Sequence, residues 1–325
     1  MKPSYLLDWN ELAFGKKSVL GKGDKIFIAA PRKLSAKRIN QIIKTQLPKA
    51  DIVFGVSKEE YVGGLEDCSQ FQMLSLSDLN PIAEKLSKAK LPHTFHILEY
   101  NQRDLIHILQ KVSFKKAVFF NGSWYGPFHM KPVYYELVNS KTPYELVSPF
   151  IDEQEAQVYA DEHRNDSLWH LAYTSVTEAE LFDVVTQAAR ASYDYAAYQT
   201  GAVLAKKSSK DYKVLLTSHN VVLPYETYAM HHGSLREKNF AVQNDMNYYD
   251  TLHAEMVLLA KALAQKVSLK NCSLFVNLLP CPQCARMLAE TDITEVVYGI
   301  DHSAGFAVQL LEQCGKSVRR VIQDQ

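Results

Sequence analysis

The chain has 325 residues, 47% of them apolar and 22% charged, which is the composition of an ordinary globular protein long enough for two domains. Lysine plus arginine and aspartate plus glutamate both number 36, so the formal net charge is zero. Proteins dedicated to nucleic acids usually carry a basic excess, because neutralising phosphate supplies much of their affinity. This balance argues against that class, although it leaves room for a local basic patch.

The five cysteines are an odd number, and two of them share one C-x-x-C. This usage argues against a disulfide framework and favours a reducing compartment. The N-terminal residues lack the apolar segment of a signal peptide, and no apolar run approaches the roughly 20 residues that span a bilayer. We therefore expect a cytoplasmic protein without membrane contact.

The first part of the chain alternates strand-like and helix-like segments. Strands are expected at residues 25–30, 51–56, 94–98 and 117–120, with a further short strand at 72–76. Helices are expected at residues 35–47, 77–88 and 101–111. Strands separated by helices of this length favour a parallel or mostly parallel sheet. The pattern predicts a Rossmann-like α/β accessory domain over residues 1–145, with a role that the sequence leaves open.

A Phe-Asn-Gly-Ser-Trp-Tyr-Gly segment at residues 120–126 follows the last of these strands. It could line a ligand crevice, although turn chemistry explains the same residues equally well. Residues 146–172 are polar and acidic, and they predict a linker that carries an exposed helix. A second domain is then expected over residues 173–325.

The second domain also alternates helices and strands. Residues 202–205 and 214–217 predict a hairpin, and residues 178–191 carry apolar side chains at helical spacing. Further helices are expected at residues 253–264, 281–288 and 304–313, and further strands at 273–279, 294–300 and 318–322. Thr251 is the expected N-cap of the helix at 253–264.

Two short segments of this domain carry metal-binding residue types. His253-Ala254-Glu255 and Pro280-Cys281-Pro282-Gln283-Cys284 together offer one imidazole and two thiolates, which are ligands that zinc accepts. Both segments fall at predicted helix N-termini, where exposed N–H groups and the helix dipole favour thiolates. Three protein ligands are typical of a catalytic zinc, because the fourth position stays open for water. Such a zinc lowers the pKa of its water towards about 7, and Glu255 lies close enough to move protons on it.

The alternatives are a structural zinc and a metal-free C-x-x-C. A structural site is normally closed by four ligands. The candidates for a fourth ligand, Cys272, His231 and His232, lie at no standard ligand spacing. A metal-free interpretation would leave the joint H-x-E and P-C-x-x-C pattern unexplained.

At these residues the chain resembles the cytidine deaminase-like superfamily, especially its deoxycytidylate deaminase branch, over residues 175–322. The resemblance implies a three-layer α/β/α domain with a five-stranded mixed sheet, in which the helix at 304–313 makes the last two strands parallel. It also implies that the strand at Gly201 and Ala202 lies against the substrate base. Asn220, at the end of the next strand, is expected to contact the substrate's sugar or base.

A long insert separates Asn220 from His253. The resemblance implies that such an insert helps to enclose the substrate, and Ser234 and Arg236 are therefore candidate phosphate contacts. The other interpretation is a solvated loop in which Arg236 pairs locally. His231 and His232 could bind a second metal or simply serve at the surface. Asn277 stands where the resemblance leads us to expect threonine, which leaves the substrate preference open.

These observations predict a zinc-dependent hydrolytic deaminase that acts on a cytosine nucleoside or nucleotide and releases ammonia. Alternative substrates are a base in RNA or single-stranded DNA and a purine or pterin-like base, and the neutral charge makes nucleic acid the weaker choice. The non-enzymatic alternative is a zinc-containing nucleotide-sensing or regulatory protein. The presence of Glu255 argues against it. The expected partner is a small-molecule substrate, and a homo-oligomer is compatible with the sequence.

Overall fold

A computed structural model describes residues 3–15, 20–21, 23–162, 175–242, 245, 247–302 and 304–322. Its contacts divide the chain into two compact units that interleave along the sequence. The first unit comprises Met1–Glu162, Tyr195–Ala197 and Thr227–Tyr249. The second unit comprises His163–Asp194, Tyr198–Glu226 and Asp250–Gln325. The contiguous boundaries that the sequence suggests, at residues 145 and 172, stay a prediction.

The first unit is built on a parallel sheet that, among the described residues, has six strands in the order β1-β4-β3-β2-β5-β6. The strands are β1 (Leu6–Asp8), β2 (Lys25–Ile28), β3 (Asp51–Ser57), β4 (Phe95–Tyr100), β5 (Lys116–Phe120) and β6 (Tyr144–Val147). The chain runs from β2 through β3 to β4 on one side, and it then crosses to the other side of β2 for β5 and the edge strand β6. The strand order therefore reverses between β2 and β5.

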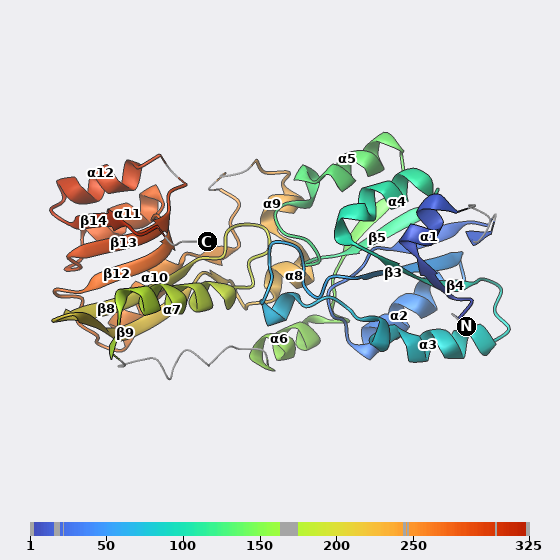
Figure 1. Ribbon diagram of the computed structural model, residues 1–325, viewed down its shortest axis with the longest axis horizontal. Helices are drawn as coiled ribbons and strands as arrows, with labels where there is room; N and C mark the ends of the chain where they lie inside the picture. The colour runs from blue at the N-terminus through green and yellow to red at the C-terminus, as the bar shows by residue number, and fades with distance from the viewer. Residues whose placement is uncertain are drawn as a thin grey trace. The chain divides into compact units, whose positions relative to one another are not determined.

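Helices cover both faces of this sheet (Figure 1). The helices of this unit are α1 (Trp9–Phe14), α2 (Ala36–Gln46), α3 (Leu76–Lys88), α4 (Leu105–Lys111), α5 (Pro132–Asn139), α6 (Glu153–Glu162), α8 (Tyr228–His232) and α9 (Leu235–Lys238). Short 3-10 turns occupy Ser69–Phe71, Gln102–Asp104 and Phe128–Met130. Figure 1 shows α2 and α3 on one face of the sheet and α1, α4 and α5 on the other.

Helix α2 shows how the sequence builds this unit. It begins after Ser35, whose side chain accepts the N–H of Arg38 and so satisfies a backbone donor that the helix cannot. Its buried residues, Ile39, Ile42 and Ile43, join the core formed with the sheet. The short strand predicted at residues 72–76 is wrong, because Gln72 and Met73 make only isolated bridges and Leu76 already begins α3.

The second unit contains a mixed sheet in the order β14-β13-β12-β8-β9-β7. Its strands are β7 (Ser175–Val176), β8 (Gly201–Ser208), β9 (Asp211–His219), β12 (Ser273–Leu278), β13 (Glu295–Ile300) and β14 (Ser317–Arg320). The antiparallel β8–β9 pair confirms the predicted hairpin, and the parallel β13–β14 pair confirms the direction of the last strands. Among the described residues the sheet has six strands rather than five, because the two-residue β7 pairs with β9.

Helices lie on both faces of this second sheet. They are α7 (Glu178–Arg190), α10 (Ala254–Ala264), α11 (Pro282–Ala289) and α12 (Phe306–Gln313). Successive residues of β8 point to opposite faces, so Val203 packs with α7 whereas Ala202 and Leu204 pack with the other three helices. A separate antiparallel pair, β10 (Val221–Val222) and β11 (Thr251–Leu252), leads into α10. None of the helices in the described residues is long and apolar enough to cross a membrane.

Candidate metal centre

Two helix N-termini of the second unit present the metal-binding side chains. His253 is the N-cap residue of α10, and Cys281 is the N-cap residue of α11, with Pro282 at the first helical position. Both predicted placements at helix starts are confirmed. The predicted cap at Thr251 is wrong, because Thr251 lies in β11 and pairs with Val222, and the N-cap is His253, two residues later.

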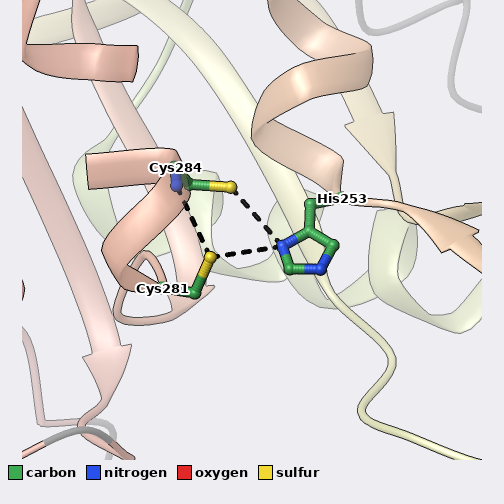
Figure 2. Close-up of side chains that lie close together, drawn as sticks. All are labelled: His253, Cys281 and Cys284. Atoms are coloured by element: carbon green, nitrogen blue, oxygen red, sulfur yellow. Dashed lines mark hydrogen bonds between the residues drawn. The ribbon is translucent and has the colours of Figure 1, made fainter. Parts of the chain in front are cut away.

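The three predicted zinc ligands converge on one point (Figure 2). The Nδ1 atom of His253 lies 3.5 Å from the Sγ atom of Cys281 and 3.4 Å from that of Cys284. All three ligand atoms lie within 4.8 Å of one another. Zinc–sulfur and zinc–nitrogen bonds of ordinary length at a tetrahedral angle separate the two donors by about 3.5 Å. The donor types and their spacing therefore fit one zinc ion.

Hydrogen bonds within the cluster distribute its protons. The pKa of Cys281 is lowered to about 4, first by a hydrogen bond with the thiol of Cys284 and then by His253. The backbone N–H of Cys284 also points at the Cys281 sulfur, 3.5 Å away. The same interaction and burial raise the pKa of Cys284, and the bond to Cys281 raises that of His253. The protein itself thus favours a thiolate at Cys281, which is the form that binds a metal.

Glu255 occupies the first turn of α10, two residues after His253. Its side chain is only 3% exposed, and burial raises its pKa, although His253 nearby opposes this effect. The shift favours a carboxyl that can both hold and release a proton. The thiol of Cys284 is among the groups that act on its pKa, so this carboxyl belongs to the same cluster of titratable side chains.

Gly201 and Asn220 lie beside the start of β8, in the same unit as the metal cluster. A side chain at Gly201 would collide with α7, because a Cβ there would lie 2.1 Å from the carbonyl oxygen of Val185. The Oδ1 atom of Asn220 accepts the N–H of Thr200 at 2.8 Å, and its Nδ2 donates to the carbonyl of Tyr198 at 3.1 Å. Asn220 therefore holds the segment that enters β8. The neighbouring Ala202 is fully buried.

Asn277 makes a matching pair of hydrogen bonds with the backbone at the start of β8. Its Oδ1 accepts the N–H of Gly201 at 3.0 Å, and its Nδ2 donates to the carbonyl of Gln199 at 2.9 Å. The sequence showed Asn277 only as a departure from an expected threonine. Its actual partners lie about 76 positions away in the chain, beyond the reach of local pattern analysis.

Ser234 and Arg236 lie in the first unit rather than with the metal ligands. Both are buried, and Ser234 caps α9 by accepting the N–H of Glu237. The guanidinium of Arg236 donates to the carbonyl of Val242 and stacks 4.5 Å from the ring centre of Tyr249. The structure thus gives both residues local partners, and their contact with a substrate phosphate stays a prediction.

His231 and His232 also lie in the first unit. The Nδ1 atom of His231 is 2.7 Å from the hydroxyl of Ser148, and the two imidazole rings lie 4.4 Å apart. Within the part of the chain that the structure describes, the group that could hold a metal is the cluster of His253, Cys281 and Cys284.

Residues 175–300 match the family model of the cytidine and deoxycytidylate deaminase zinc-binding region. The match assigns a zinc-type deaminase region to the C-terminal half of the chain and confirms zinc as its cofactor. It covers the hairpin, both ligand-bearing helix starts and the strand between them. No curated protein matches the chain.

Several solved structures are similar to part of the chain. The apo dCMP deaminase of cyanophage S-TIM5 is 21% identical, covering 44% of this chain and 95% of its own, with a TM-score of 0.32. The same phage enzyme in complex with dCMP and dUMP covers 53% of this chain and 100% of its own, at 21% identity and a TM-score of 0.31. The guanine deaminase of Nitrosomonas europaea is 13% identical, covering 48% and 84%, with a TM-score of 0.33.

Proposed function

We propose that the protein is a zinc-dependent hydrolytic deaminase that acts on a cytosine nucleoside or nucleotide. The observation that carries the proposal is the cluster of His253, Cys281 and Cys284, spaced for a single ion beside the buried carboxyl of Glu255. The match of residues 175–300 to the cytidine and deoxycytidylate deaminase region supports cytosine as the base.

The Nδ1 atom of His253 and the two cysteine sulfurs would hold the zinc. When bound, zinc supplies Lewis-acid activation of water at neutral pH, because three protein ligands leave one position open. The helix N-termini of α10 and α11 hold the three side chains in place without a further ligand. They also stabilise the negative charge of the thiolates.

Glu255 would move the protons of the reaction. Hydrolytic deamination adds water to the ring carbon that bears the exocyclic amine, and it then breaks the bond between that carbon and the amine. The carboxylate of Glu255 would take one proton from the attacking water and deliver it to the ring nitrogen. Glu255 would then carry the proton of the added hydroxyl to the amine, so that the bond between carbon and amine breaks, a carbonyl forms at the ring carbon and ammonia departs. Burial, which raises the pKa of Glu255, suits a group that must accept and return a proton near neutral pH.

The start of β8 would support the substrate base. Ala202 presents only a methyl group on the face that carries α10, and Asn220 and Asn277 fix the backbone beside it. A rigid backbone at this position would orient the base towards the carboxyl of Glu255.

We further infer that the first unit is a Rossmann-like domain. The strands β4-β3-β2-β5-β6 follow the sequence in which doubly wound sheets grow outwards from a central strand, with β1 added at one edge. This architecture supports an accessory ligand-binding role for the first unit, which lies outside the two ligand-bearing helices of the deaminase region.

The test measures ammonia release by the zinc-loaded full chain from cytosine, cytidine, deoxycytidine, their phosphates, guanine and oligonucleotides. We expect activity on a cytosine nucleoside or nucleotide. A Glu255→Gln variant should keep its zinc, measured by elemental analysis, and lose at least 100-fold in kcat, the lower bound for a general acid–base group. Cys281→Ser should lose the metal itself.

Two results would overturn separate parts of the proposal. A zinc-loaded protein that releases no ammonia from any cytosine compound would exclude the substrate class. Full activity in Glu255→Gln with zinc retained would exclude the role of that carboxyl.

A further inference from the structure

The carboxyl edge of the first unit's sheet has the topology of a ligand-binding crevice. The strand order reverses between β2 and β5, which lie next to each other. In open α/β sheets, ligands bind outside the carboxyl ends of the strands at this point of reversal. Two segments leave the sheet there: residues 29–35 after β2, and residues 121–127 after β5.

Arg32, in the first of these segments, is fully buried. Its Nη2 donates to the carbonyl of Gln70 and, at 2.9 Å, to the hydroxyl of Tyr159. Its Nε and Nη1 atoms find no acceptor among the described residues, and no described carboxylate forms an ion pair with it. A buried guanidinium without a negative partner is among the most costly groups that a fold can carry, so it is typically kept for a partner that arrives from outside.

Asn121, in the second segment, lacks a hydrogen-bond donor for its side-chain oxygen, Oδ1, among the described residues. That side chain is only 3% exposed. The adjoining Gly122 has a φ of 78°, and a Cβ there would lie 3.4 Å from the Cδ of Arg32. The hydroxyl of Ser123 accepts the backbone N–H of Arg32 at 2.9 Å. The turn after β5 is therefore fixed directly against Arg32.

Further positive charge gathers at the same edge. Helix α2 starts four residues after Arg32 and directs its N-terminus to this side of the sheet. In its first turn, Arg38 donates from Nη2 to the carbonyl of Ser148 at 2.7 Å, just beyond β6. Burial lowers the pKa of Arg38, whereas Glu155 and Glu145 raise it. Glu155 and Glu145 thus interact with Arg38. Arg32, in contrast, forms no ion pair with a carboxylate of the described residues.

We propose that this edge binds a small phosphate ester, a nucleotide or sugar phosphate, in a site separate from the metal centre. The phosphate oxygens supply the acceptors that Arg32 lacks, and a hydroxyl or amine of the same ligand supplies the donor that Asn121 lacks. An inorganic anion would satisfy only the first of these needs. Because both groups are buried, binding displaces the Tyr159 ring of α6, whose centre lies 4.9 Å from the Arg32 guanidinium.

The test titrates the full chain calorimetrically with AMP, adenosine, CMP, cytidine, ribose 5-phosphate and inorganic phosphate. We expect a phosphate ester to bind at least tenfold more tightly than both its unphosphorylated counterpart and inorganic phosphate. Asn121→Ala and Arg32→Lys should each weaken that binding at least tenfold. Arg103→Met, at an exposed arginine of the same unit, should leave it unchanged.

Circular dichroism checks that each variant is folded. If Arg32→Lys unfolds, Asn121→Ala still tests the site, because it removes no buried charge. Glu255→Gln and Cys281→Ser, at the metal centre, should bind the phosphate ester as the unaltered protein does. Loss of binding in Cys281→Ser would place the ligand at the metal centre and overturn the proposal. The proposal would also be overturned if no phosphate ester bound, or if a folded Asn121→Ala variant bound the ester as the unaltered protein does.

Discussion

At the scale of single residues, two amide side chains decide how the chain enters β8. Asn220 and Asn277 each use both the oxygen and the nitrogen of the side chain on the backbone of residues 198–201. A side-chain amide that both accepts from and donates to the backbone makes the two hydrogen bonds that a neighbouring strand would otherwise make. The entrance to β8 is thus held by side chains, at the point where substrate is expected to lie.

Replacing Asn277 with alanine should test this support. The N–H of Gly201 and the carbonyl of Gln199 would lose their partners, at a cost of about 1–3 kcal/mol in the free energy of unfolding. Urea denaturation measures this loss, and KM for the deaminase substrate should rise with it. The exposed Asn239→Ala provides the control, and an Asn277→Ala protein as stable as the control would contradict the prediction.

The metal-free cluster predicts an unusual cysteine reactivity. Because the pKa of Cys281 is lowered to about 4, its thiolate persists as the pH falls from 7 to 5. The alkylation rate should stay nearly constant over that range, whereas glutathione should slow about tenfold per pH unit. Mass spectrometry after iodoacetamide treatment of chelator-stripped protein measures the rate at Cys281. Zinc should protect it, and a rate that falls with pH as for glutathione would show that the thiolate is not stabilised.

At the scale of secondary-structure elements, an arginine on the edge strand β14 joins it to a helix and to the next strand. Arg319 donates from Nη1 to Glu178 of α7 at 2.7 Å and from Nε to Glu295 of β13 at 2.8 Å. The hydrogen bond from Arg319 is the main reason that the pKa of Glu178 is lowered. The group is partly exposed, so solvent weakens the interaction.

This link predicts a pH-dependent stability. A carboxyl with a pKa lowered by folding stabilises the protein above its unfolded-state value, about 4.5, and this contribution disappears as the pH falls through the lower folded-state value. Glu178→Gln should therefore lower the urea midpoint at pH 7 and match the unaltered protein more closely at pH 3. Glu312→Gln, at an exposed site, is the control. An equal difference between the proteins at both pH values would exclude the linkage.

The elements also show what the sequence can predict. The hairpin follows from local signals, and the parallel last strands follow from the resemblance and the helix at 304–313; both are confirmed. The metal ligands could also be predicted from the sequence, because their residue types and spacing are local to two helix starts. The bonds of Asn277 were not, because its partners are fixed only by strand pairing between distant segments. Strand β7 was missed since two residues carry no detectable alternation.

At the scale of the whole molecule, the first unit is assembled from three separate stretches of chain. Glu237, in the third stretch, is buried and accepts the Nε1–H of Trp124 at 2.7 Å and the N–H of Phe128 at 3.1 Å. It also accepts the hydroxyl of Tyr195, from the second stretch, at 2.9 Å. One carboxyl therefore joins all three stretches, and burial raises its pKa despite these donors.

Glu237→Ala should destabilise residues more than 100 positions away. The buried donors of Trp124 and Phe128 would lose their acceptor, at about 1–3 kcal/mol each. Thermal unfolding should show the loss, and hydrogen–deuterium exchange should speed up at residues 124–130. Lys238→Ala, next to it on the exposed side of α9, should change neither measurement. Faster exchange confined to the stretch around residue 237 would contradict the prediction.

The interleaving of the units has a consequence for protein synthesis. A ribosome makes the chain from its N-terminus, and domains generally fold as they emerge. The first unit cannot finish in this way, because Trp124 waits for a carboxyl that is translated more than 100 residues later. Its parallel sheet can form early, while the surface that Glu237 completes stays open until two stretches of the second unit, His163–Asp194 and Tyr198–Glu226, have left the ribosome. In the nascent chain, the first unit is therefore completed only after the second unit has begun to emerge.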